Sequence, residues 1–261
     1  MPSVSLNGAD LHYLDTGRGE RVVLLLHAFP LHSGMWSRQL PELAKDQRVI
    51  APDYRGLGKS RGVTDASSMD LLARDMLALL AHLGVERAAV VGLSMGGYLA
   101  LELYRQAPAL FRGLVLADTR AGADTEEGKT GREQFARDAL ERGLSWVADQ
   151  LVPKLLKPVP DPAAVAELRS LIGEGTVEGV AAAQRGMARR PDSFPTLASI
   201  SCPTLVLVGE EDTLTPTAEA DKLAAGVPNA RLVTIPGAGH ISCIESPEAF
   251  TRALTAFLGA I

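Results

Sequence analysis

The chain of 261 residues lacks the features that mark several specialised classes of protein. Its two cysteines, Cys202 and Cys243, are too few for a disulfide framework or a cysteine-rich metal site. Both adjoin apolar segments, where buried thiols are common, so we interpret them as structural. The chain has no basic run and a formal net charge of −5, which argues against nucleic acid or an anionic membrane surface as a partner.

Long apolar runs are also missing. No run approaches the roughly 18 to 20 residues that span a bilayer, and residues 1–7 lack the basic and apolar regions of a signal peptide. The sequence therefore predicts a cytoplasmic location and no membrane partner. With 46% hydrophobic and 22% charged residues, the composition is that of an ordinary globular protein with a large core.

Short apolar runs that alternate with helical periodicity indicate an α/β fold with a mostly parallel sheet. The continuous runs 22–26, 48–51 and 88–91 are typical of strands that helices cover on both faces. Helices are predicted between them, over 35–43 and over 69–83, where apolar residues recur at three-and-four spacing. The remaining elements are predicted as a hairpin at 4–6 and 11–14, strands at 114–117, 204–208 and 231–235, and a last helix at 247–258.

The strand signal stops between residues 119 and 202, where the sequence becomes helical, charged and interrupted by prolines. We expect residues 119–202 to form an inserted helical cap on a core domain of residues 1–118 and 203–261. Within it, the polar segment 122–131 is expected to be a mobile, solvent-facing loop. A group of apolar residues either forms a helix face over a cleft or simply packs the cap onto the core: Trp146, Val147, Leu151, Val152, Leu155 and Leu156.

The segment Gly92-Leu93-Ser94-Met95-Gly96 lies where a predicted strand turns into a helix. A serine in such a sharp turn can present its hydroxyl as a nucleophile, and the glycines leave the turn uncrowded. A serine hydroxyl is a weak nucleophile at neutral pH, so this interpretation requires a histidine base and a carboxylate that orients it. Ser94 is therefore a candidate nucleophile whose partners must be found elsewhere in the chain.

Of the five histidines, His240 has the most suitable position, in a glycine-rich loop after the last predicted strand. Open parallel sheets place active-site groups at the carboxyl ends of their strands. The candidate acids are Asp212, Glu210 and Glu211 after one strand and Asp118 after another. We favour Asp212, because the order serine, acid, histidine with the acid after the cap is the commoner arrangement. Asp118 is then expected to have a capping or hydrogen-bonding role.

These segments, in this order, resemble the α/β-hydrolase fold family over nearly the whole chain. The matching segments are Leu26-His27-Ala28-Phe29-Pro30, residues 53–60, 92–97 and 209–216, and Gly237-Ala238-Gly239-His240. The resemblance implies an α/β-hydrolase fold with a mostly parallel eight-stranded sheet, flanking helices and an inserted helical cap. Within the family, the chain is similar to small bacterial carboxylesterases and 3-oxoadipate enol-lactonases.

The same resemblance implies roles for particular residues. The backbone N–H groups of Phe29 and Met95 would form an oxyanion hole, and His27 would support the loop that carries Phe29. Asp53, Arg55 and Gly56 would brace the next turn. No cofactor and no metal are implied.

The function predicted is hydrolysis of carboxylic esters with small, mostly apolar acyl groups, through a Ser94, His240 and Asp212 triad and an acyl-enzyme. The partner is a small-molecule ester or lactone, and the chain is expected to be a monomer or a small homo-oligomer. Enol-lactone hydrolysis is the alternative, and a cofactor-free haloperoxidase, a perhydrolase or a ligand receptor that retains the triad is less favoured. The alternative needs a cation for the substrate carboxylate, for which five arginines are available: Arg120, Arg132, Arg185, Arg189 and Arg190.

Overall fold

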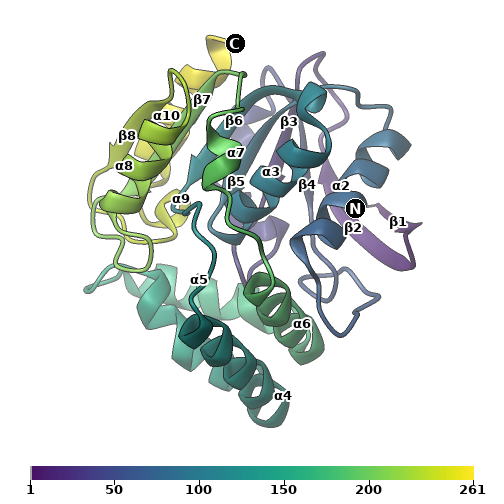
Figure 1. The fold of residues 1–261 in the computed structure, drawn as a ribbon, viewed down its shortest axis with the longest axis vertical. Helices are drawn as coiled ribbons and strands as arrows, with labels where there is room; N and C mark the ends of the chain where they lie inside the picture. Colours follow the sequence, from purple (N-terminus) through teal and green to yellow (C-terminus); the bar gives the residue numbers. More distant parts are fainter. Residues whose placement is uncertain (1) are drawn as a thin grey trace.

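The computed structural model describes residues 2–261 and is built on one eight-stranded sheet (Figure 1). The strand order is β1-β2-β4-β3-β5-β6-β7-β8, with β2 antiparallel to its neighbours and all later pairs parallel. Every residue of β3, β5 and β7 is buried, because helices cover the sheet on both faces. The predicted α/β fold with a mostly parallel eight-stranded sheet is thus confirmed. The strands are β1 (Ser3–Leu6), β2 (Ala9–Asp15), β3 (Val22–Leu26), β4 (Arg48–Pro52), β5 (Ala88–Leu93), β6 (Phe111–Ala117), β7 (Thr204–Gly209) and β8 (Arg231–Ile235).

Most predicted helices are present, with one clear exception. The helix expected over residues 35–43 is wrong: a 3₁₀ turn and a single α-helical turn lie there instead. Pro41 has no N–H to donate to the preceding turn, so a helix cannot run through it without losing a hydrogen bond. The helices are η1 (Ser33–Trp36), α1 (Leu40–Leu43), α2 (Met69–His82), α3 (Met95–Gln106), η2 (Pro108–Leu110), α4 (Glu126–Leu155), α5 (Pro162–Gly173), α6 (Val177–Ala188), α7 (Phe194–Leu197), α8 (Thr217–Gly226), α9 (Ser242–Glu245) and α10 (Pro247–Gly259).

Four helices, α4 to α7, stand between β6 and β7 in the chain. Figure 1 shows α4, α5 and α6 grouped beyond one end of the sheet, and α4 packs against both of the others. Gly143, with φ 83°, interrupts α4. The division at residues 118 and 203 into core and cap stays a prediction. Of the helices in residues 2–261, none combines the length and the apolar character needed to cross a bilayer.

The expectation of a mobile loop over residues 122–131 is wrong for its second half. α4 begins at Glu126, and the Thr125 side chain accepts a hydrogen bond from the Gly128 N–H at its start. Asp124, just before this cap, is buried, with a side-chain exposure of 3%. The polar composition of the segment therefore reflects a helix start and an internal ion pair.

A buried ion pair fixes the loop after β4 against α2. Arg55 donates to both carboxylate oxygens of Asp75, at 2.5 and 2.8 Å, and the two side chains are 2% and 0% exposed. The same guanidinium donates to the carbonyls of Asn7 and Gly62, so four of its five N–H groups are paired. Arg55 therefore braces this turn, as the sequence predicts.

Replacing Asp75 with alanine leaves the Arg55 charge buried and without its partner. We expect this change to lower the free energy of unfolding by about 3 to 5 kcal/mol, measured by urea denaturation. The matched control is Asp70→Ala on the same helix, which removes exposed contacts with Arg74 and Gln106 and an acid from the first turn. That variant should differ from wild type by no more than about 1 kcal/mol. Equal effects of the two changes would contradict the role given to the buried pair.

Candidate active site

Ser94 occupies a strained backbone position between β5 and α3. Its φ of 56° and ψ of −113° lie in a region that residues with a side chain rarely adopt, at a cost of about 1 to 3 kcal/mol. Its N–H donates to the Ala117 carbonyl, and its own carbonyl accepts from the Gly97 N–H and the Thr119 hydroxyl. The surrounding structure thus holds Ser94 in a conformation that the chain alone would avoid.

Two glycines allow the backbone around Ser94 to pack this closely. A Cβ on Gly92 would lie 2.2 Å from the Gly96 carbonyl oxygen, and a Cβ on Gly96 would lie 2.1 Å from the Leu26 carbonyl oxygen. Both contacts are with backbone atoms, so a rotamer change cannot relieve them. The glycines predicted to leave the turn uncrowded are therefore required by the packing of α3 against β3 and β5.

The structure brings Ser94, His240 and Asp212 together in one hydrogen-bonded line. His240 Nε2 lies 2.8 Å from Ser94 Oγ, and His240 Nδ1 lies 2.9 Å from Asp212 Oδ2. The side chains of His240 and Asp212 have no exposed surface. With the Nδ1 proton directed at the carboxylate, Nε2 is the nitrogen available to accept the serine proton.

Asp212 is held as an acceptor by its own loop. The N–H groups of Leu214 and Thr215 donate to Oδ1 at 2.8 and 2.9 Å, and the Thr215 hydroxyl donates to Oδ2 at 2.6 Å. Burial raises the pKa of Asp212, but hydrogen bonding and charge attraction from His240 outweigh it, so the pKa lies below the usual value. The carboxylate therefore stays ionised and keeps the imidazole oriented.

The other candidate acids have different partners. Asp118 accepts from the Gly209 N–H at 2.7 Å and from the Ser242 hydroxyl, which matches the hydrogen-bonding role expected for it. Burial, with Asp212 nearby, raises the pKa of Asp118 well above the usual value. Glu210 accepts from the Gly237 N–H, and Glu211 is exposed. Among these four acids of the described chain, the hydrogen bond to His240 is made by Asp212.

The loop after β3 places Phe29 beside the triad, with its structure set by His27. His27 Nδ1 donates to the Ala28 carbonyl at 2.9 Å, and Nε2 accepts from the Tyr54 N–H at 3.1 Å. Burial lowers the pKa of His27 to about 4, so the ring is neutral and acts as a fixed support. Met95 is the first residue of α3, where a helix provides no carbonyl for the N–H. The oxyanion hole at Phe29 and Met95 stays a prediction.

A cavity of about 490 Å³ opens onto Ser94 and His240. Its apolar lining comes from α4 and α6 and from the loops after β3 and β7, and four of its lining residues are charged. Leu151 and Leu155 line the cavity, whereas Val147 and Val152 are buried in the core. The apolar face of α4 therefore both covers the cleft and packs against the core, the two alternatives that the sequence left open. The apolar lining residues are Phe29, Phe135, Leu151, Leu155, Met187 and Leu214, and the charged ones are Arg120, Asp124, Arg132 and Lys154.

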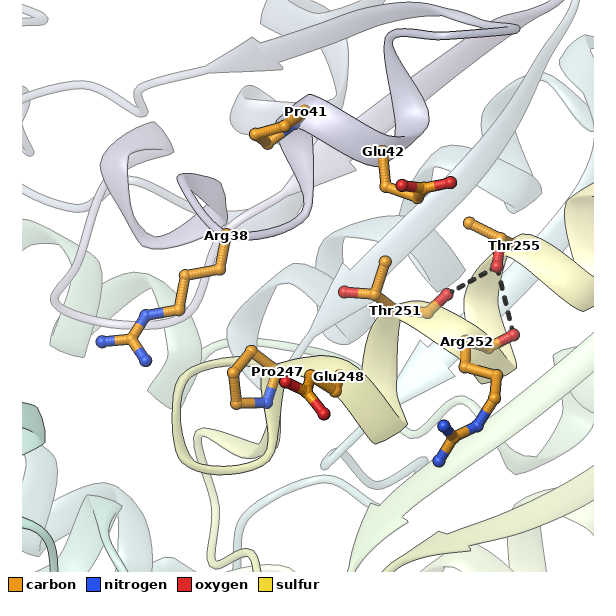
Figure 2. A pocket seen from close by; sticks show the side chains of 8 residues that line it. All are labelled: Arg38, Pro41, Glu42, Pro247, Glu248, Thr251, Arg252 and Thr255. Carbon is orange, nitrogen blue, oxygen red and sulfur yellow. Dashed lines mark hydrogen bonds between the residues drawn. The ribbon is translucent and has the colours of Figure 1, made fainter.

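A second hollow, of about 540 Å³, lies between the η1–α1 segment and α10 (Figure 2). Its wall on α10 includes Thr251 and Thr255, and the Thr255 hydroxyl is bonded to carbonyls of its own helix. No triad residue reaches it, so its lining offers neither a histidine base nor an activated nucleophile. The lining residues are Arg38, Pro41, Glu42, Pro247, Glu248, Thr251, Arg252 and Thr255.

Comparison with known proteins agrees with this fold. The sequence profile described as the alpha/beta hydrolase fold matches residues 21–247. The chain belongs to the α/β-hydrolase family. It is 30% identical to 3-oxoadipate enol-lactonase 2 of Acinetobacter baylyi, over 95% of this chain and 92% of that protein.

Two solved structures are similar to this α/β hydrolase over nearly the full length of each chain. A thermophilic esterase from Thermogutta terrifontis, solved with malate bound, has a TM-score of 0.95 and 37% identity, and the match covers 99% of this chain and 98% of that one. An enol-lactonase from Burkholderia xenovorans LB400 has a TM-score of 0.90 and 29% identity, with 99% and 100% covered.

Some residues of the site in this α/β hydrolase were not found by sequence reasoning. The Thr215 hydroxyl donates to Asp212 and lies 3.2 Å from His240 Nδ1. In the sequence, the one indication of this role is that Thr215 lies three residues after Asp212. Among the five arginines considered for a substrate carboxylate, Arg120 and Arg132 line the cavity. Arg185 instead pairs with Glu133 and Asp65, and Arg189 lies near Asp65.

Replacing Gly96 with alanine tests the packing that holds Ser94. The added Cβ must displace the Leu26 carbonyl, so we expect the free energy of unfolding to fall by roughly 1 to 3 kcal/mol and esterase turnover to fall at least about 100-fold. Gly173→Ala at the end of α5, where an added Cβ meets no atom within 4 Å, is the control. Denaturant unfolding and ester hydrolysis of both variants measure the effect, and wild-type turnover by Gly96→Ala would show that the close approach is unnecessary.

Proposed function

We propose that this α/β hydrolase cleaves small carboxylic esters through Ser94, His240 and Asp212. The observation that carries the proposal is the hydrogen-bonded line of these three side chains at the base of a cavity. A serine nucleophile, a histidine base and a carboxylate that orients it are the groups that acyl transfer needs.

The reaction follows from the positions of these atoms. His240 Nε2 accepts the proton of Ser94 Oγ as that oxygen attacks the ester carbonyl, and Asp212 stabilises the imidazolium that forms. The N–H groups of Phe29 and Met95 are proposed to bind the negative oxygen of the tetrahedral intermediate. His240 then donates its proton to the departing alcohol, and the acyl group stays on Ser94 as an acyl-enzyme. Water then takes the place of the alcohol, and the same steps run in reverse: His240 accepts a proton from water as the water attacks the acyl carbonyl, and returns a proton to Ser94 as the acid departs.

The relatives support a reaction at an ester carbonyl. The protein from T. terrifontis is named an esterase, and those from A. baylyi and B. xenovorans are named enol-lactonases. Both names describe hydrolysis at an ester carbonyl, which in a lactone is part of a ring. Lactone hydrolysis uses the same nucleophile and base, and the arginines in the cavity favour it as the second candidate function. The cytoplasmic location and the monomeric or small homo-oligomeric state stay predictions.

Ser94→Ala should abolish turnover of p-nitrophenyl butyrate, because it removes the attacking oxygen. Asp212→Asn should lower kcat by roughly 10³- to 10⁴-fold, since the amide no longer fixes the imidazole in the tautomer that accepts the serine proton. The matched control is Glu211→Gln, an exposed carboxylate next to Asp212 on the same loop, which should retain wild-type kcat. Steady-state release of p-nitrophenolate measures all three. Full activity of Ser94→Ala would overturn the assignment.

A further inference from the structure

Three arginines surround one buried carboxylate at the edge of the catalytic cavity. Asp124 accepts from Arg120 Nη2 at 2.7 Å, from Arg190 at 2.7 and 2.9 Å, and from Arg132 Nε. The arginines come from different segments: Arg120 follows β6, Arg132 is in α4, and Arg190 follows α6. We call Asp124, Arg120, Arg132 and Arg190 the arginine cluster.

The members of the arginine cluster differ in how they are used. Arg190 is 3% exposed and donates also to the carbonyls of Met187 and Gly122, so it joins the end of α6 to the loop after β6. Arg120 and Arg132 are 34% and 19% exposed and line the cavity. Arg190 therefore holds the cluster together, and Arg120 and Arg132 present charge to whatever occupies the cavity.

The charge of the cavity has the opposite sign to that of the chain. The cavity is lined by three cationic side chains, Arg120, Arg132 and Lys154, and by one carboxylate, that of Asp124. The chain as a whole has a net charge of −5. One carboxylate cannot occupy the N–H groups of three guanidiniums, each of which has five. Arg132 uses Nη1 for the Gln184 side chain, at 2.9 Å, and its Nη2 makes no hydrogen bond among residues 2–261. The cavity thus concentrates positive potential and free donors beside the triad.

The arginine cluster lies a short distance from the nucleophile. The Arg190 guanidinium is 4.2 Å from the centre of the Tyr98 ring, and Tyr98 follows Ser94 by four residues in α3, a rise of roughly 6 Å. Tyr98 lines the same cavity as Ser94. Arg120 and Arg132 line this same cavity of about 490 Å³, so one small ester can contact Ser94 and an arginine at once, against Leu151, Leu155 and Met187.

We propose that this cavity selects esters or lactones that carry a free carboxylate, which Arg120 and Arg132 bind while the scissile carbonyl lies at Ser94. This inference rests on the proposed function, because it names the substrate class of the same site. A guanidinium matches a carboxylate with two parallel hydrogen bonds, and the arginines are already held in place by Asp124. The substrate is thus apolar next to the scissile bond and anionic at its far end.

The test compares an anionic substrate with its neutral isostere on the same enzyme sample. On the acyl side the pair is mono-p-nitrophenyl glutarate and p-nitrophenyl 5-methylhexanoate, in which an isopropyl group replaces the carboxylate. On the alcohol side it is 4-carboxyphenyl acetate and 4-isopropylphenyl acetate. The measured quantity is the ratio of kcat/KM for the anionic ester to that for the neutral one. Loss of folded enzyme cancels from this ratio.

We expect Arg120→Gln and Arg132→Gln to lower the ratio by roughly 10-fold or more for at least one pair, as loss of a charged hydrogen-bonding partner does. Arg132→Lys keeps the charge without the fork of donors and should fall between wild type and Arg132→Gln. The matched control is Arg185→Gln, a cap arginine paired with Glu133 outside the cavity, whose ratio should equal that of wild type. Higher salt should lower the wild-type ratio for the pair that responds.

The outcomes separate this inference from the proposed function. Suppose that Arg120→Gln and Arg132→Gln give the wild-type ratio for both pairs of esters, and that hydrolysis still requires Ser94. The carboxylate subsite is then wrong, and the proposed esterase activity stands. If Ser94→Ala still hydrolyses the neutral esters, the proposed function itself fails. A fall of the same size in Arg185→Gln would show a general effect of charge and overturn the subsite.

Discussion

The close contact of α3 with the end of β3 determines the rest of the site. Gly96 packs with its Cα against the Leu26 carbonyl, and no larger residue fits there. This contact forces the chain to turn within one residue, so Ser94 takes a left-handed backbone conformation and directs its hydroxyl out of the turn. The strained backbone costs stability, and the close packing of Gly92 and Gly96 holds Ser94 in it.

The parallel sheet brings the remaining groups to this serine. Ser94 follows β5, Asp212 follows β7 and His240 follows β8, and all three strands end at the same edge of the sheet. Asp118 follows β6, which lies between β5 and β7, and bonds both the end of β7 and Ser242 just after His240. The loops that carry Asp212 and His240 are therefore tied to one buried carboxyl, in addition to the bond between these two residues.

The local sequence was sufficient for the strands of the sheet, and it pointed to the three residues that the structure brings together. Strands 22–26 and 231–235 were predicted with the observed ends, because continuous apolar runs and turn residues mark a covered strand within a few residues. His240 was chosen because it follows the last predicted strand, and Asp212 because of its place in the order serine, acid, histidine. The helix predicted over 35–43 is absent, because Pro41 interrupts a pattern of apolar spacing that otherwise suits a helix. The roles of Thr215 and Asp124 depend on contacts between loops, and the surface-like composition of residues 122–131 hides a buried carboxylate.

The proposed reaction requires that Ser94 is the group that becomes acylated. A p-nitrophenyl alkylphosphonate, which mimics the tetrahedral intermediate and stays bound, tests this most directly when its attachment site is found by peptide mass spectrometry. We expect one phosphonyl group per chain, on Ser94, with equal release of p-nitrophenolate and a proportional loss of ester hydrolysis. Complete inactivation with Ser94 unmodified, or full modification of Ser94 with hydrolysis retained, would contradict it.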